Sequence, residues 1–216
     1  SANLGVLAMI GVIAGREARL AVTAASSTDA VASPTAGEGL VGAHIIAVQW
    51  ESFSFLPGFA IGTAAAALAG QFLGAGNVAM ARRAVFVCTG IAVALMGLLG
   101  IVYMLFGQSL TELISTQAKH LGLVPQLLFI CGITQVFFAV SMVVRQALRG
   151  LGDTVWTFAI TTISSYGIRL PAAWIFGIVL DLGLIGVWIA LCGELAVRAC
   201  LFLARFLHGG WATRKV

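Results

Sequence analysis

The chain has 216 residues, of which 60% are hydrophobic and only 9% carry a charge. A typical soluble domain has about 45–50% apolar and about 25% charged residues, so this chain lacks the polar surface that a soluble fold needs. The formal net charge is +4, but the 12 lysines and arginines are scattered rather than gathered in a patch. The composition therefore indicates a membrane protein and argues against a soluble enzyme, a nucleic-acid-binding protein and a disordered tail.

The first apolar run covers residues 2–14. It is shorter than the roughly 18 residues that a helix needs to cross a bilayer. A signal-peptide core, a re-entrant segment and the end of a truncated span could each have this length, but the basic start of a signal peptide is absent. We expect residues 1–14 to be a truncated first transmembrane helix, with further sequence upstream in the native protein. We expect residues 15–39, which are rich in Ala, Ser and Thr, to form an extracytoplasmic loop.

Longer apolar stretches follow, and each is long enough to cross the hydrocarbon core as a helix. They cover residues 41–81, 84–111, 121–144, 154–180 and 182–204. These spans predict an all-α integral membrane protein with five transmembrane helices over residues 40–206 and a tail at residues 207–216.

The charges between the spans predict the orientation of the chain. The loops that share a side with the C-terminal tail, together with the tail, carry seven basic residues, and the opposite loops carry three. By the positive-inside rule, the tail and the turn at residues 74–83 face the cytoplasm. We therefore expect a multi-pass protein of the inner or plasma membrane.

Several motifs occur in a definite order along the chain. VGAHIIAVQWESFSFLPG at residues 41–58 leads into an Ala-rich stretch that ends in GQFLGAGN at residues 70–77. RQALRGLGDT (145–154), RLPAAW (169–174) and GLIGVW (183–188) follow, and the last span contains a glutamate and an arginine four residues apart. This series resembles the C-terminal six-helix lobe of the multidrug and toxic compound extrusion (MATE) transporters over residues 41–211.

The resemblance implies twelve helices in two six-helix lobes, of which this chain supplies one with its first helix truncated. It implies a secondary antiporter that exports drugs or other organic, often cationic, compounds in exchange for H⁺ or Na⁺ by alternating access. The implied partners are a small organic substrate, the lipid bilayer and the missing N-terminal lobe, with no nucleic acid. Some family members place cation-binding carboxylates in the first and fourth helices of this lobe. Residues 2–14 and 121–144 contain no acid here, so the coupling ion stays open.

Two alternatives stay open. The same architecture could move a lipid-linked precursor or a metabolite, or the chain could be a non-transporting membrane fragment or assembly subunit. No Ser–His or two-His constellation supports an enzyme. The four cysteines lie in apolar runs without a CxxC pair, so we expect neither a metal site nor a cofactor beyond the coupling ion.

Charges inside the predicted spans are the main candidates for function, since a charge at the bilayer centre costs at least about 2.5–3.5 kcal/mol. Glu51, Arg169 and Glu194 lie 12 or 13 residues from the outer boundary, and therefore share a layer about 18–20 Å deep. We take Glu51 as the first candidate for ion coupling or substrate contact, because it precedes the helix kink that Pro57 predicts. Its alternative role is a carboxylate paired for assembly.

Local spacing suggests partners for the other charges. Glu194 precedes Arg198 by four residues, which favours a structural ion pair on one helix. Arg169 stands two residues before Pro171, where a second kink is predicted. Arg169 could pair with Glu51 or Glu194, or bind a carbonyl that the proline frees.

His44 lies seven residues before Glu51 and hence on nearly the same helical face. It could belong to a proton path, or it could be structural. Arg145 lies close to the predicted cytoplasmic boundary, where we expect it to extend its guanidinium towards water.

The tryptophans have two readings. Trp50, Trp174 and Trp188 could line a cavity and attract organic cations through their ring faces. The depths of Trp174 and Trp188, each seven residues from the turn at residue 181, favour an aromatic belt at the outer interface. Trp156 and Trp211 are placed to form an inner belt.

Overall fold

The computed structural model of the chain describes residues 2–26 and 38–211. Throughout these residues the secondary structure is helical, without a strand, which confirms the predicted all-α class. Two of the elements, η2 and η3, have the wider π-helical geometry. In chain order the elements are α1 (Ala2–Ser26), α2 (Glu38–Gly74), α3 (Val78–Glu112), α4 (Ala118–Gly150), α5 (Thr154–Thr162), η2 (Ile163–Arg169), α6 (Leu170–Trp174), η3 (Ile175–Val179) and α7 (Gly183–His208).

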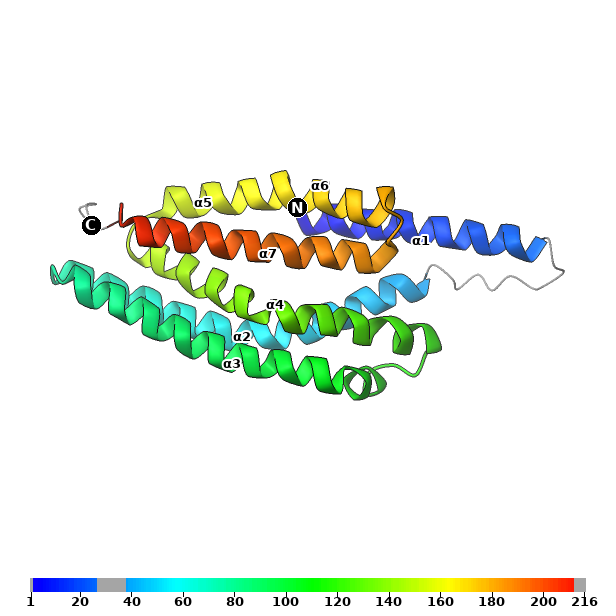
Figure 1. Cartoon of the computed structure of the whole chain (residues 1–216), viewed down its shortest axis with the longest axis horizontal. Coiled ribbons are helices and arrows are strands. Elements are labelled where there is room, and N and C mark those ends of the chain that lie inside the picture. Colours follow the sequence, from blue (N-terminus) through cyan, green and yellow to red (C-terminus); the bar gives the residue numbers. More distant parts are fainter. Residues whose placement is uncertain (1, 27–37, 212–216) are drawn as a thin grey trace.

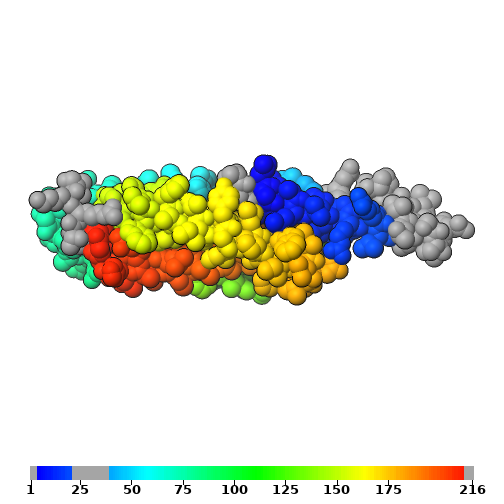
Figure 2. All heavy atoms as spheres, turned by 90° about the horizontal axis from the view of Figure 1, so that it is seen from above, coloured from blue at the N-terminus to red at the C-terminus, as the bar shows by residue number. Residues whose placement is uncertain are grey.

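The helices run side by side along one long axis (Figure 1). α3 packs against α2 and α4, α4 packs against α7, and α5 to η3 cover the side of α7 away from α4. α1 contacts α2, α6 and α7. It begins near the middle of the long axis and runs to the end where α2 starts (Figure 1). Figure 2 shows the face that α5 and α6 build above α7, with α1 adjoining it at one end.

Four helices in the described part of the chain are long and apolar enough to cross a membrane. They are Gly39–Gly74, Val78–Glu112, Ala118–Gly150 and Gly183–His208. The chain is therefore built as a multi-pass membrane protein. α1 is not among these four, because charged residues begin at Arg16 within its second half.

The fifth predicted span, residues 154–180, is helical from Thr154 to Val179 but changes geometry on the way. It widens from α to π geometry in η2, returns to α in α6 and widens again in η3. Pro171 is the second residue of α6, just after η2, and a proline inside a helix removes one hydrogen bond and clashes with the carbonyl four residues earlier. A π turn relieves this clash, so the predicted break at Pro171 takes the form of a widened helix.

The structure corrects the predicted start of the first loop. Residues 15–26 continue α1 instead of forming a loop. Residues 16–26 contain neither Gly nor Pro but four alanines, two arginines, a glutamate and a leucine, which favour a helix even without apolar surroundings. Residues 27–37 of the predicted loop lie outside the described residues.

Two ion pairs connect this second half of α1 to the rest of the bundle. Arg16 lies 3.4 Å from Asp181, and Glu17 lies 3.2 Å from Lys119. All four side chains are at least 39% exposed. Ion pairs this exposed contribute about 0–1 kcal/mol, so they orient α1 more than they stabilise it.

Close contacts between helices depend on glycines at the points where the helices meet. A Cβ atom added to Gly100 would lie 2.5 Å from the carbonyl oxygen of Gly132, where α3 meets α4. A Cβ atom added to Gly150 would lie 2.3 Å from the carbonyl oxygen of Ala66, where α4 meets α2. Small residues let the backbones of membrane helices approach this closely. The helices then associate through van der Waals contact between them, because burial from lipid gives no hydrophobic driving force.

Of the two tryptophans predicted to form an inner aromatic belt, only Trp156 has the exposed side chain that a belt requires. Trp156 is 48% exposed, and the Arg205 guanidinium lies 4.9 Å from its ring centre. Trp211 is fully buried instead, with its ring stacked 5.3 Å from that of Phe206. Its indole N–H donates to the Phe206 carbonyl at 2.8 Å. Trp211 therefore packs in the core beside the C-terminal end of α7.

Candidate functional site

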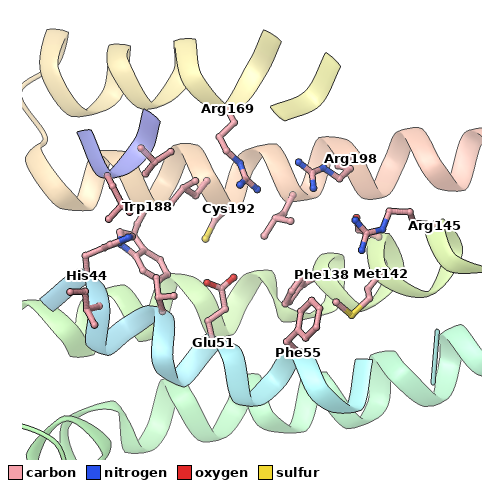
Figure 3. A pocket seen from close by; sticks show the side chains of 17 residues that line it. His44, Glu51, Phe55, Phe138, Met142, Arg145, Arg169, Trp188, Cys192 and Arg198 are labelled. Carbon is pink, nitrogen blue, oxygen red and sulfur yellow. The ribbon is translucent and has the colours of Figure 1, made fainter. Parts of the chain in front are cut away.

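A cavity of about 520 Å³ lies between α2, α4, η2 and α7, with the start of α1 on one side (Figure 3). Its walls mix apolar and aromatic side chains with ionisable ones, which is the composition expected of a small-molecule site. The polar and ionisable side chains that line it are His44, Glu51, Ser141, Arg145, Arg169, Trp188, Cys192 and Arg198. The apolar lining includes Val48, Phe55, Phe138, Met142, Leu191 and Leu195.

Glu194 organises the wall that α7 and η2 share. Its carboxylate is fully buried and lies between two guanidiniums. Arg169 Nη2 lies 2.9 Å from Oε2, and Arg198 Nε lies 2.7 Å from Oε1. The Ser164 hydroxyl also donates to Oε1. Glu194 is not among the residues that line the cavity, so both arginines stand between its carboxylate and the open space.

The π geometry of η2 helps to build this network. Ser164 and Ser165 are consecutive, yet both reach α7: Ser164 contacts Glu194, and Ser165 Oγ accepts a hydrogen bond from Arg198 Nη2 at 2.9 Å. A wider turn rotates successive residues by a smaller angle, so two neighbours can face the same helix. The predicted pairing of Glu194 with Arg198 is present, and Arg169 makes its direct ion pair with Glu194 rather than Glu51.

Glu51 projects from α2 into the cavity towards the wall that carries Arg169 and Cys192 (Figure 3). Among the described residues, its carboxylate has no ion pair or side-chain hydrogen bond. The positive charge of Arg169 acts on it through space. Glu51 therefore differs from Glu194: one carboxylate is available to a ligand, and the other is held.

Pro57 lies inside α2, which stays helical through it. The proline removes the N–H that would bond to the Phe53 carbonyl, which weakens this turn of the helix. Ser54 supports the same stretch, because its hydroxyl donates to the Glu51 carbonyl at 2.7 Å and accepts from Gln135 Nε2 at 3.1 Å. The Ser54–Gln135 hydrogen bond thus holds the segment that carries Glu51 against α4, next to the turn in which Pro57 removes a backbone hydrogen bond.

His44 and Trp188 form a second polar contact in the cavity wall. The indole N–H of Trp188 donates to Nδ1 of His44 at 3.2 Å, and both side chains are buried. A ring nitrogen that accepts a hydrogen bond carries no proton, so this contact fixes His44 as the neutral Nε2–H tautomer. Of the two roles that the sequence left open for Trp188, the structure supports the cavity wall and not the favoured outer belt, because the indole is buried and faces inwards.

The other tryptophan candidates do not line the cavity. Trp50 packs beside Phe53 with ring centres 5.6 Å apart, and its carbonyl accepts a hydrogen bond from the Tyr103 hydroxyl at 2.6 Å. Trp174 is 53% exposed on the outside of α6, where an aromatic belt would need it. Neither residue touches the space that Glu51 faces.

The sequence did not reveal the contribution of α4. Phe138, Ser141, Met142 and Arg145 all line the cavity, and their spacing of three and four residues places them on one helical face. Arg145 points into this cavity instead of extending towards the membrane surface, which corrects the expectation for it (Figure 3). The periodicity could have identified this stripe, but only with knowledge of which helix faces it.

Helices of membrane-spanning length with a charged cavity between them define a multi-pass membrane protein with an internal small-molecule site. The chain belongs to the MatE family, because the family's model matches residues 19–175. This confirms the resemblance to MATE transporters that the ordered motifs carry.

Curated relatives include several proteins named as multidrug resistance proteins. The chain is 31% identical over 181 residues to the probable multidrug resistance protein NorM of Thermotoga maritima, which covers 84% of this chain and 39% of that protein. It is 34% identical over 175 residues to the NorM proteins of Burkholderia mallei and Burkholderia vietnamiensis. Each of these alignments covers 79% of this chain, and they cover 37% and 38% of the two relatives. The matched region is therefore less than half the length of these relatives.

Solved structures share the fold. An inward-facing multidrug resistance MATE transporter of the MOP superfamily aligns with a TM-score of 0.74 at 18% identity, covering 96% of this chain and 44% of that chain. The MATE transporter ClbM, solved in complex with Rb⁺, aligns with a TM-score of 0.65 at 17% identity, covering 82% of this chain and 48% of that chain.

Proposed function

We propose that the chain forms one lobe of a multidrug efflux transporter and that the cavity between α2, α4 and α7 holds part of the transport path. The observation that carries this proposal is the charged cavity between helices of membrane-spanning length. Secondary transporters bind substrates and coupling ions near the middle of the membrane and alternate access around that site. The names of the NorM relatives support multidrug efflux as the activity.

The coupling ion in this proposal is H⁺ or Na⁺, and Glu51 is the residue that exchanges it. Glu51 lines the cavity, and its carboxylate takes part in none of the ion pairs between described residues. Intramembrane carboxylates mark ion pathways, because burying them without a function is costly. The complex of a related fold with Rb⁺ supports testing a monovalent metal cation beside the proton.

The opposite lobe is the partner that completes the path. The chain covers 44% of the inward-facing transporter to which it aligns, which supports a second lobe of similar size. A cavity in one lobe becomes a transport path when the other lobe rocks against it. We propose the cell membrane as the location, with the C-terminal tail in the cytoplasm.

Export from vesicles tests this function. The full-length protein is reconstituted into sealed vesicles with ethidium, a cationic dye, as probe, and a pH or Na⁺ gradient is imposed. The proposal predicts dye movement against its gradient only when one of the two ion gradients is present. Dye movement that is equal with and without both gradients would contradict it.

A further inference from the structure

The lining of the cavity carries more positive than negative charge. Three arginines, Arg145, Arg169 and Arg198, reach the space that a single carboxylate, Glu51, also faces. The second carboxylate of this region, Glu194, lies behind the wall and is shared by two of the arginines. Even with both carboxylates ionised, one positive charge of this group is left over. An uncompensated charge inside a membrane is costly, so the excess among the described residues calls for a negative group from outside them.

Arg198 offers free donors at one end of the cavity. Its side chain is only 9% exposed, and its Nε and Nη2 atoms bond to Glu194 and to two serines of η2. Among the described residues nothing accepts from the remaining nitrogen, Nη1. A guanidinium has five N–H donors, so the network with Glu194 fixes the orientation of Arg198 and leaves an edge for a further acceptor.

Arg145 faces the same end of the cavity from α4 (Figure 3). Its Nε atom is buried without a hydrogen-bond partner, and it has no ion pair with any described residue. The charges that act on it come from Arg149 and Arg198, and both are positive. Two desolvated guanidiniums with no anion between them repel each other, and an oxyanion placed between them would remove that penalty.

The surroundings of these arginines are apolar. Phe55, Phe138 and Met142 line the cavity beside them, and Leu195 adds a further apolar side chain from α7. The ligand that fits this lining has an oxyanion at one end and an apolar body at the other. Guanidiniums suit carboxylates and phosphates in particular, because their planar fork makes paired hydrogen bonds to two oxygens.

We propose that Arg145 and Arg198 form an anion subsite that binds the carboxylate or phosphate of an amphiphilic organic anion. The inference rests on the proposed function and adds a substrate class to it: the cavity accepts compounds that carry an oxyanion, beside the cationic compounds that the family resemblance implies. Glu194 acts as a positioning residue, because it holds Arg198 with one edge towards the cavity.

Equilibrium binding to the purified full-length protein tests the subsite. The probe is the fluorescent dye pyrenebutyrate, whose carboxylate is its only ionisable group, compared with its uncharged methyl ester. We expect the anion to bind at least about ten-fold more tightly than the ester, the factor that one charged hydrogen bond supplies. Arg145→Gln should remove most of this preference, and Arg145→Lys should keep part of it. Arg83→Gln is the control and should leave the preference unchanged, since Arg83 is an exposed arginine of α3 that does not line the cavity.

Competition distinguishes the possible sources of the anion. Displacement of the dye by phosphatidic acid in phosphatidylcholine nanodiscs, but not by a soluble aryl phosphate, identifies a lipid headgroup. Displacement by the soluble phosphate identifies a free organic anion. Either outcome supports the subsite if the Arg145→Gln protein also binds that competitor more weakly.

Equal affinity for the acid and the ester in the wild-type protein would overturn the subsite. An unchanged preference in a folded Arg145→Gln protein would overturn it too. Because binding is measured without a gradient, a protein that binds the anion but exports nothing contradicts the proposed function and leaves the subsite intact.

Discussion

Arg169 and Glu194 meet across the boundary between η2 and α7, with Nη2 2.9 Å from Oε2 and Nε 3.2 Å from the same oxygen. This contact decides the roles of two carboxylates. Because Arg169 and Arg198 both bind Glu194 directly, Glu51 on the opposite wall is left with no direct charge partner among the described residues. The division into a held carboxylate and an available one underlies the predictions that follow.

Glu194→Gln should destabilise the protein strongly. The change leaves two buried guanidiniums without their shared counter-charge, and removing one partner of a buried ion pair costs about 3–5 kcal/mol. The thermal unfolding midpoint of the purified full-length protein measures this. Glu112→Gln, an exposed glutamate at the end of α3, is the control and should leave the midpoint almost unchanged. Equal midpoints for the two variants would show that the network is not structural.

Packing between α4 and α2 can be tested with a pair of glycines on one helix. Gly150→Ala places a Cβ against the Ala66 carbonyl, so the helices must move apart and stability should fall by about 1–3 kcal/mol. Gly122→Ala, where a Cβ meets nothing within 4 Å, should be neutral or stabilise by up to about 1 kcal/mol. Denaturation in detergent measures both, and a Gly150→Ala protein as stable as the wild type would refute the close approach.

Trp188 should report on the cavity through its fluorescence. A dye that enters the cavity lies next to this buried indole and should quench it, whereas Trp174 is exposed on the far side of α6. Trp188→Phe should therefore remove a larger part of the dye-dependent quenching than Trp174→Phe. If Trp174→Phe removed the larger part of the quenching, Trp188 would not line the space that the dye enters.

Orientation can be read from single cysteines at the two ends of the bundle. Ala75→Cys and Gln117→Cys both stand in exposed positions at turns on opposite ends. In a background without the four native cysteines, the charge distribution predicts labelling of residue 75 from the cytoplasmic side and of residue 117 from outside. Labelling of residue 75 from outside would reverse the orientation.

The sequence was informative wherever the physics is local. The spacing of Glu194 and Arg198 predicted an ion pair within one helix, and the length of the apolar stretches predicted the class of fold. The first loop was misplaced because its residues are good helix formers whose charges resemble those of a loop. Pro171 marked the correct position for a break, but not its form, because a π turn depends on how η2 packs against α7.

Contacts between helices could not be derived in the same way. The spacing of Trp188 favoured an outer belt, but its side chain lies inside the bundle, since the face that a helix turns inwards depends on its neighbours. The same limit applied to Arg145, whose position near a boundary suggested exposure while its helical face placed it in the cavity. The pairing of Arg169 with Glu194 rather than Glu51 also needed the three-dimensional arrangement. Both glutamates lie 12 or 13 residues from the predicted outer boundary, so their spacing did not distinguish them.

Ion-driven export by Glu51→Gln is the measurement that tests the central claim most directly. Glutamine keeps the size and polarity of the side chain but cannot ionise or exchange a cation. Because Arg169 keeps its ion pair with Glu194, we expect Glu51→Gln to insert and fold normally. Its gradient-driven export should then fall to the rate seen without a gradient, while Glu112→Gln exports as the wild type does. A well-folded Glu51→Gln protein that still exports at the wild-type rate under the same gradient would show that coupling lies elsewhere.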